Sequence, residues 1–103
     1  MTPPLSDTRC AELFKALADA TRLKILHLLA EQPKCVGDLE DDLGLAQSHV
    51  SHHLKVLKTA GLVEAERDGQ KICYALHPQV KDKLSQAKQD TLDLGCCEVT
   101  FRR

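Results

Sequence analysis

A three-residue link, Gly44-Leu45-Ala46, is the feature that most constrains how this chain can fold. Apolar residues three and four positions apart precede the link and predict a helix over residues 36–43, which Gly44 ends. The same spacing follows the link and predicts a second helix over residues 47–60. Two helices joined by so short a connection indicate a helix-turn-helix.

An alternating pattern of apolar and polar residues follows the second of these helices. Residues 62–67 and 70–76 flank Asp68-Gly69, and a dipeptide of this kind between two alternating runs predicts a β-hairpin. Two more helices are predicted upstream, over residues 6–18 and 20–31, and a last helix opens at Pro78 and closes at Gly95. The apolar stripe of the last helix consists of Val80, Leu84, Ala87, Thr91 and Leu94.

This order of elements predicts a mainly α fold with a β-hairpin wing, which is an α+β winged helix-turn-helix. The chain has 103 residues, enough for one domain with one core. Its first and last helices carry apolar stripes that so small a core leaves without enough partners. Because the same stripes on a second copy can cover them, we expect a homodimer through the first and last helices.

Composition excludes several classes of function. The formal net charge is −1, so the total charge does not indicate nucleic acid or a membrane surface, although a local basic patch stays open. No apolar run approaches the roughly 18 residues of a membrane span and no basic-then-apolar leader is present, so we expect a cytoplasmic protein without a membrane partner. Five cysteines in such a chain are expected to be reduced thiols, available as ligands or redox groups.

The second helix of the helix-turn-helix carries hydrogen-bond donors and acceptors near its N-terminal end, the end that enters the major groove in proteins of this type. Gln pairs with adenine, Ser and His reach several base edges, and Lys meets phosphates. Each side chain alone is also what a solvated helix face would carry, but the short turn and the wing together favour double-stranded operator DNA as the partner. The predicted DNA-binding residues are Gln47, Ser48, His49, Ser51, His52, His53, Lys55, Arg67 and Lys71.

Three motifs make the chain resemble the ArsR/SmtB family of metal- and metalloid-responsive repressors. They are residues 17–26 (LADATRLKIL), residues 47–57 (QSHVSHHLKVL), and residues 61–63 (GLV) followed by Arg67-Asp68-Gly69 and Tyr74. The resemblance covers nearly the whole chain and implies a dimeric winged-helix repressor that leaves its operator when an inducer binds, which relieves repression of a resistance or efflux operon. Ala20 stands where the family often has Pro, and Ala46 where it often has Ser, which implies weaker starts for two helices.

The inducer is inferred from the cysteines, because members of the family place their ligands on different elements. The arsenite pattern of the family, Cys-Val-Cys with a third Cys three residues later, is reduced here to Cys35-Val36-Gly37 and Glu40. The zinc pattern of the family requires histidines on the last helix, and no His occurs between residues 80 and 103. The vicinal pair Cys96-Cys97 remains, and two neighbouring thiolates suit one soft, thiophilic centre.

We therefore predict trivalent arsenic or antimony as the inducer, arsenite with three sulfurs or methylarsenite with two, and no resident cofactor. Cys96 and Cys97 are the predicted ligands, Cys10 from the partner's first helix is the candidate third ligand, and Cys35 is the lower-ranked alternative. Cys73 is interpreted as a small packed side chain in a strand. By domain, residues 1–5 are expected to be a disordered N-terminus, residues 6–95 the DNA-binding and dimerisation domain, and residues 96–103 a tail with the cysteine pair.

Other interpretations stay open. One is a thiol-redox or persulfide sensor in which Cys35 bonds Cys96 or Cys97, and another is a repressor that responds to Cd, Hg or Pb. His49, His52 and His53 have spacings that can hold a transition metal, a weaker interpretation because a DNA-reading face explains them already. A thiol enzyme is not expected, since the chain has no Cys-x-x-Cys and no βαβ pattern, and a winged helix that binds only protein is the remaining alternative.

Overall fold

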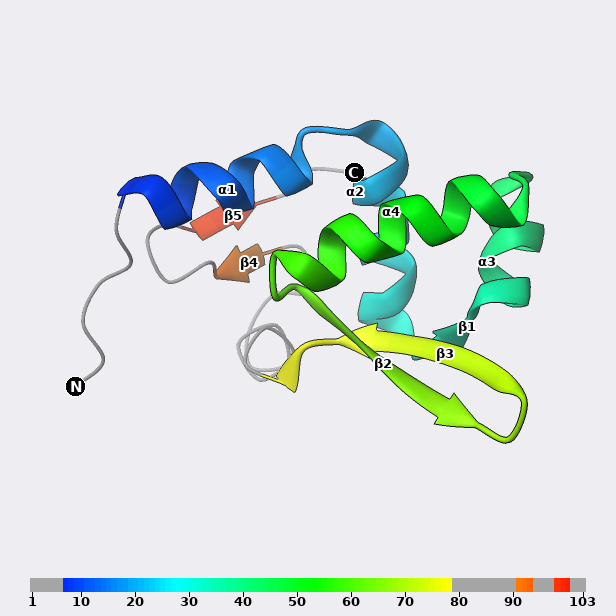
Figure 1. The fold of residues 1–103 in the computed structure, drawn as a ribbon. Helices are drawn as coiled ribbons and strands as arrows, with labels where there is room; N and C mark the ends of the chain where they lie inside the picture. Colours follow the sequence, from blue (N-terminus) through cyan, green and yellow to red (C-terminus); the bar gives the residue numbers. More distant parts are fainter. Residues whose placement is uncertain (1–6, 79–90, 94–97, 101–103) are drawn as a thin grey trace.

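The computed structural model describes residues 7–78, 91–93 and 98–100. In this part of the chain the helices are α1 (Asp7–Leu17), α2 (Ala20–Glu31), α3 (Val36–Leu43) and α4 (Gln47–Thr59). The strands are β1 (Lys34–Cys35), β2 (Val63–Asp68), β3 (Lys71–Leu76), β4 (Thr91–Asp93) and β5 (Glu98–Thr100). The predicted winged helix-turn-helix is confirmed, with α3 and α4 as the helix-turn-helix and β2–β3 as the wing (Figure 1).

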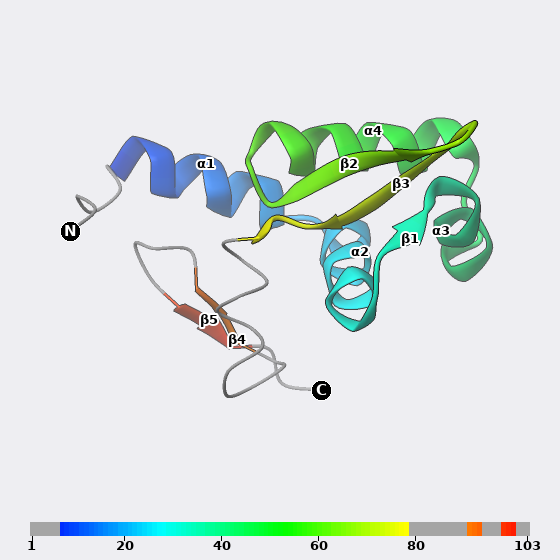
Figure 2. The ribbon, with the colours of Figure 1, turned by 90° about the horizontal axis from the view of Figure 1, so that it is seen from below.

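The wing belongs to a three-stranded antiparallel sheet with the order β1-β3-β2. The hairpin extends beside α4 in both views, and β1 joins its inner strand just before α3 begins (Figures 1 and 2). Sequence reasoning missed β1, because two residues are too few to show an alternating pattern.

The core lies where α2, α3 and α4 meet the base of the wing. Its fully buried members include Ile25 of α2, Leu39 of α3 and Leu54 of α4. From α1 the core receives Leu13, Ala16 and Leu17, whereas Phe14 on the same helix is 47% exposed. The chain therefore covers only part of the stripe of α1.

The helix ends follow local rules at two positions. Asp19 precedes α2, and its carboxylate accepts hydrogen bonds from the backbone N–H groups of Thr21 (2.8 Å) and Arg22 (3.1 Å), as an N-cap does. Gly44 ends α3 with a φ of 66°, a left-handed conformation that glycine adopts without steric cost. The short turn before α4 depends on this residue.

The predicted last helix is wrong at its C-terminal end. Thr91–Asp93 form a strand that pairs antiparallel with Glu98–Thr100, in the register Thr91↔Thr100, Leu92↔Val99 and Asp93↔Glu98. A spacing of three or four residues fits Thr91 and Leu94 to a helix, but it takes no account of a partner strand beyond Gly95, with which the β-branched Thr91 pairs. The rest of that stripe, at Val80, Leu84, Ala87 and Leu94, lies outside the described residues, as do residues 1–5.

The expectation of reduced thiols is also wrong for this structure. Cys35 and Cys73 form a disulfide, so Cys73 is not the isolated packed side chain that was predicted. The physical reason is the missed strand, because β1 pairs with β3 in a register that sets Cys35 opposite Cys73. Cys10 is disulfide-bonded as well.

Candidate nucleic-acid interface

The outward face of α4 carries most of the predicted DNA-binding residues. Val50, Leu54 and Leu57 are buried on the inward face, which turns the intervening side chains toward solvent. The exposed predicted residues of α4 are Gln47, Ser48, His49, Ser51, His52 and Lys55. They form a continuous polar surface long enough to follow a groove of double-stranded DNA.

The first turn of α4 has no side-chain cap, because Ala46 occupies the N-cap position. The backbone N–H groups of His49 and Val50 donate to the carbonyl of Ala46, at 3.1 Å each, so the N–H groups without a backbone acceptor at this end are those of Ala46, Gln47 and Ser48. Unpaired N–H groups and the positive end of the helix dipole favour a phosphate at this end. An alanine in the cap position therefore suits a helix whose N-terminus meets the DNA backbone.

His53 differs from its neighbours on α4, since it is half-buried and turned toward α2. Its Nδ1 accepts a hydrogen bond from the Arg22 guanidinium at 3.3 Å, and a guanidinium only donates, so the ring is neutral in this contact. Burial lowers the pKa of His53, and the positive charge of Arg22 lowers it further against the opposing carboxylate of Asp19. His53 thus joins α4 to α2, while His52, 5.5 Å away between ring centroids, faces solvent.

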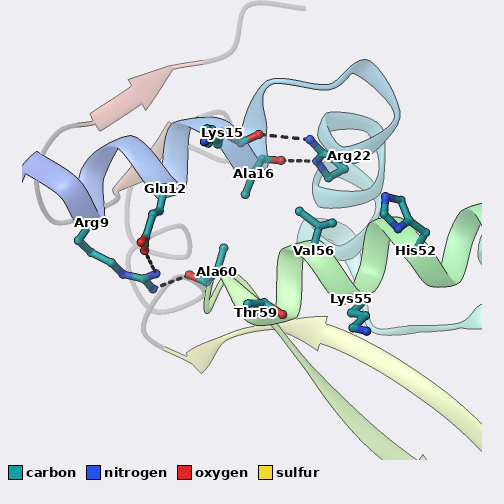
Figure 3. Close-up of a pocket in the computed structure, with 10 residues that line it drawn as sticks. All are labelled: Arg9, Glu12, Lys15, Ala16, Arg22, His52, Lys55, Val56, Thr59 and Ala60. Carbon is teal, nitrogen blue, oxygen red and sulfur yellow. Dashed lines mark hydrogen bonds and ion pairs between the residues drawn. The ribbon is translucent and has the colours of Figure 1, made fainter.

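A cavity of about 700 Å³ lies between α1, α2 and α4, and most of its charged lining is basic (Figure 3). Lys55 and His52 line it from α4, Arg9 and Lys15 from α1 and Arg22 from α2, and the carboxylate of Glu12 is the one acidic group of this lining. Because the total charge of the chain is −1, this concentration of cations is a local basic patch beside the predicted DNA-reading face.

Two arginines of this cavity bind backbone carbonyls at helix ends. Arg22 donates from Nε to the carbonyl of Ala16 (2.6 Å) and from its guanidinium to that of Lys15 (3.2 Å), both in the last turn of α1. Arg9 donates to the carbonyl of Ala60 at the end of α4 (2.6 Å) and pairs with Glu12 at 3.4 Å. Sequence reasoning did not select Arg9 or Arg22 as site residues, since contacts between positions 51 residues apart, as for Arg9 and Ala60, leave no periodic signal.

The wing places its two predicted cations at its tip. Arg67 and Lys71 are exposed, and β2–β3 pairing sets Asp68 opposite Lys71, so the turn consists of Gly69 and Gln70. Gly69 has a φ of 65°, whereas Gln70, like every other non-glycine residue that the structure describes, has no positive φ. A positive φ at the first turn residue alone is the pattern of a type II′ hairpin turn. Arg67 and Lys71 can therefore reach a DNA backbone beside the groove that α4 enters.

The predicted inducer ligands are only partly described. Cys96 and Cys97 lie outside the described residues, Cys10 lies on α1, and Cys35 is the N-cap residue of α3. Within the described residues no group of three or more His, Cys, Asp or Glu side chains is arranged to hold a metal ion, and His49, His52 and His53 do not form one. The described helices also include none long and apolar enough to cross a membrane.

Comparison with known proteins gives the family of the chain. Residues 19–65, from the N-cap of α2 into the wing, match the model of the "Bacterial regulatory protein, arsR family". The HTH-type transcriptional regulator Rv0081 of Mycobacterium tuberculosis is 42% identical over 77% of this chain and 71% of its own. A probable mercury resistance operon repressor of Streptomyces lividans is 37% identical over 84% and 74% of the two chains, and the arsenic resistance regulator ArsR1 of Pseudomonas putida 40% over 78% and 58%.

Solved structures show the same fold. The crystal structure of Rv0081 superposes with a TM-score of 0.66 at 43% identity, covering 72% of this chain and 75% of that one. A winged helix-turn-helix DNA-binding domain from Mycobacterium bovis, described as homodimeric, superposes with a TM-score of 0.70 at 32% identity, covering 81% and 82%. The family model, these relatives and the shared winged fold show that the chain belongs to the ArsR/SmtB family of DNA-binding transcriptional repressors.

Proposed function

We propose that this chain is a homodimeric, cytoplasmic repressor that trivalent arsenic or antimony releases from its operator, bound by Cys96 and Cys97 with Cys10 as the third ligand. The observation that supports this assignment is how the five cysteines divide. Cys35 and Cys73 bond each other, and the disulfide-bonded Cys10 therefore has neither of them as its partner. This division separates Cys10 from the Cys35–Cys73 pair and supports it, rather than Cys35, as the third ligand beside Cys96 and Cys97.

The chemistry needs reduced thiols and no change of oxidation state at arsenic. Arsenite, As(OH)₃, reacts with three thiols: three As–O bonds break, three As–S bonds form, and each hydroxide leaves with a thiol proton as water. Methylarsenite, CH₃As(OH)₂, reacts in the same way with two thiols and releases two waters. Soft thiolate ligands favour this exchange. Relatives named for arsenic resistance and for mercury resistance support a thiophilic inducer.

The inducer is tested by titrating the operator complex with arsenite, methylarsenite, antimonite, Cd, Hg and Zn, under a phosphine reductant that does not chelate arsenic. Cys96→Ser and Cys97→Ser should each keep operator binding but lose release by arsenicals, and Cys73→Ser is the matched control that should respond normally. Cys10→Ser should weaken release by arsenite more than release by methylarsenite. Release of the Cys96→Ser, Cys97→Ser double variant at the wild-type arsenical concentration would move the site away from the C-terminal pair.

The roles of the DNA-binding residues are separated by salt. Ser48, Ser51 and His52 are proposed to read bases, while Lys55, Arg67 and Lys71 are proposed to contact phosphates. Lys71→Ala should weaken binding to all DNA alike and lower the salt slope by about one. His52→Ala should cost about 1–3 kcal/mol at particular base pairs, and equal losses on operator and random DNA would contradict base reading.

The dimer is proposed to form through α1 and the C-terminal part of the chain. Phe14 supports this, since it is 47% exposed on the helix whose other large apolar side chains are buried. In sedimentation at micromolar concentration, Phe14→Glu should shift the protein toward the monomer. Ile72→Glu is the matched control, because Ile72 is equally prominent at 43% exposed but lies on the wing. A wild-type monomer would contradict the dimer.

A further inference from the structure

The disulfide between Cys35 and Cys73 has no part in the arsenical site proposed above. It joins β1 to β3 at a register pair, and both residues are half-buried, so a small oxidant or reductant can reach the sulfurs. Cys73 lies on the inner strand of the wing, and Cys35 is the residue from which α3 begins. The two cysteines therefore connect the wing with the start of the helix-turn-helix.

The covalent loop that this disulfide closes contains the whole predicted DNA-reading unit. Cys35 and Cys73 are 38 residues apart in sequence, and α3, α4, β2 and the hairpin turn lie between them. All nine predicted DNA-binding residues, from Gln47 to Lys71, fall inside this loop. Of the two register pairs between β1 and β3, Cys35↔Cys73 encloses the unit more closely, since Lys34↔Tyr74 lies one residue further out on each strand.

Without the disulfide, the wing is fastened to β1 by a short noncovalent contact. The β1–β3 pairing consists of two register pairs, Lys34↔Tyr74 and Cys35↔Cys73. The N-terminus of α3 is itself held locally, since the backbone N–H of Cys35 donates to the Asp38 carboxylate at 3.1 Å and Lys34 pairs with Asp42 at 2.6 Å. A covalent bond at this point consequently fixes the inner strand of the wing to a firmly held helix end.

We propose that Cys35 and Cys73 are a reversible thiol-oxidation site that tunes operator affinity by locking the wing onto the helix-turn-helix. One thiol loses its proton and the thiolate attacks hydrogen peroxide, the O–O bond breaks, a sulfenic acid forms, and the leaving hydroxide takes up that proton as water. The second thiol then attacks the sulfenic sulfur, which forms the S–S bond and expels a second water, so two thiols and one peroxide yield a disulfide and two waters. A dithiol reductant reverses the step by exchange.

The locked form binds DNA more tightly, because the order that the wing needs on DNA is already present before binding. The expected gain is about 3–10-fold in operator affinity, the range that ordering of one flexible segment typically costs. The test compares full-length protein treated with hydrogen peroxide and with a phosphine reductant, on operator DNA. Peptide mapping after thiol blocking should find the Cys35 and Cys73 peptides linked only in the oxidised sample.

Three variants make the test specific. Cys35→Ser and Cys73→Ser should bind operator equally in both redox states, whereas Cys10→Ser, which leaves this pair intact, should keep the full gain. The locked form should also melt on the order of 10 °C or more above the reduced form, a readout that does not involve DNA. This readout matters because the affinity comparison rests on the repressor function.

The possible outcomes are distinct. Linked peptides with equal or weaker operator affinity would overturn the regulatory role, and absence of the linked peptides would overturn the site. A gain that persists in Cys73→Ser would assign the effect to other cysteines and also overturn the site. Linked, stabilised protein that binds no DNA in either state would refute the repressor function together with the tuning, while the thiol chemistry itself would stand.

Discussion

Replacement of Arg22 by alanine should destabilise the fold more than any other substitution of a charged side chain facing the basic cavity. The Arg22 guanidinium donates to two carbonyls in the last turn of α1, Ala16 at 2.6 Å and Lys15 at 3.2 Å, and to Nδ1 of His53 at 3.3 Å. The last carbonyls of a helix have no partner within the helix, so Arg22 supplies what α1 lacks at its C-terminal end. It also places a positive charge at the negative end of the dipole of α1.

The magnitude follows from these contacts. A hydrogen bond to a charged group contributes about 1.5–3 kcal/mol, and the half-buried position of Arg22 together with the two longer distances favours the lower part of that range. Loss of the shorter carbonyl bond and part of the other two should lower the free energy of unfolding by about 2–4 kcal/mol. For a domain of this size that corresponds to a decrease in Tm of roughly 10–25 °C.

The assay is urea unfolding of Arg22→Ala and Arg22→Lys under reducing conditions, with Lys24→Ala as the control. Arg22→Lys keeps the charge, but a single ammonium group cannot bond both carbonyls as the planar guanidinium does. About half of the loss in free energy of unfolding should therefore remain. Lys24 is exposed on the same helix, and its replacement should change the free energy of unfolding by about 0.5 kcal/mol or less. A loss below about 0.5 kcal/mol for Arg22→Ala, or no loss for Arg22→Lys, would refute the argument from hydrogen bonding.

The remaining predictions concern pH and one turn. Burial lowers the pKa of His53 below its ordinary value of 6.5. As pH drops, the unfolded chain therefore takes up the proton first, and the free energy of unfolding should fall below about pH 6.5. His53→Gln should flatten this decline in urea titrations, and an unchanged profile would contradict the role of His53. The hydrogen bond from the Arg22 backbone N–H lowers the pKa of Asp19 in the folded state. The contribution of Asp19 to the free energy of unfolding is therefore complete above pH 3.8 and is lost as pH falls through the lower pKa of the folded state. Asp19→Asn, which keeps an acceptor, should remove this decline at acid pH, measured by circular dichroism. Gly44→Ala should cost about 1–2 kcal/mol in urea unfolding from the left-handed φ alone, since a Cβ there meets nothing within 4 Å, and a neutral result would contradict this origin.

Most of the fold could be predicted from sequence because its long elements repeat a pattern. Apolar residues three and four positions apart identified all the described helices, and the ends of α2 and α3 agree with the prediction to the residue. The Asp68-Gly69 signal located the wing, although the turn lies one residue later, at Gly69 and Gln70. Periodicity succeeds in the helices because one face of each is buried in the core, whereas the wing, which is mostly exposed, was located by its turn signal.

What the sequence did not show depends on contacts between distant residues. β1 has two residues and becomes a strand only because β3 offers it a partner, and the Cys35–Cys73 bond was missed with it. Thr91–Asp93 likewise becomes a strand through pairing with Glu98–Thr100. His53 was predicted to face DNA with its neighbours, and the Arg22 contact that draws it inward joins residues 31 positions apart.

In the candidate site, too, the sequence predicted the residues that helical periodicity exposes but not those that packing brings from another helix. Helical geometry was sufficient to select the exposed residues of α4, because the buried positions of a helix determine which positions remain outside. It could not select Arg9 or Lys15, which reach the cavity beside α4 only because α1 packs there. The basic patch is consequently a property of the packing, in a chain whose total charge is −1.

The contacts of α1 provide a route by which a ligand bound at the proposed Cys10 site can act on DNA binding by α4. Arg22 connects the end of α1 to His53 in the middle of α4, and Arg9 connects the start of α1 to the carbonyl of Ala60 at the end of α4. Because α4 is attached at two separated points, a displacement of α1 relative to the rest of a dimer displaces α4 with it. The same helix carries Cys10, the proposed third ligand, and the exposed Phe14. An inducer bound there releases DNA only to the extent that it prefers the displaced arrangement, and by the same coupling operator DNA must weaken the binding of the inducer by an equal factor.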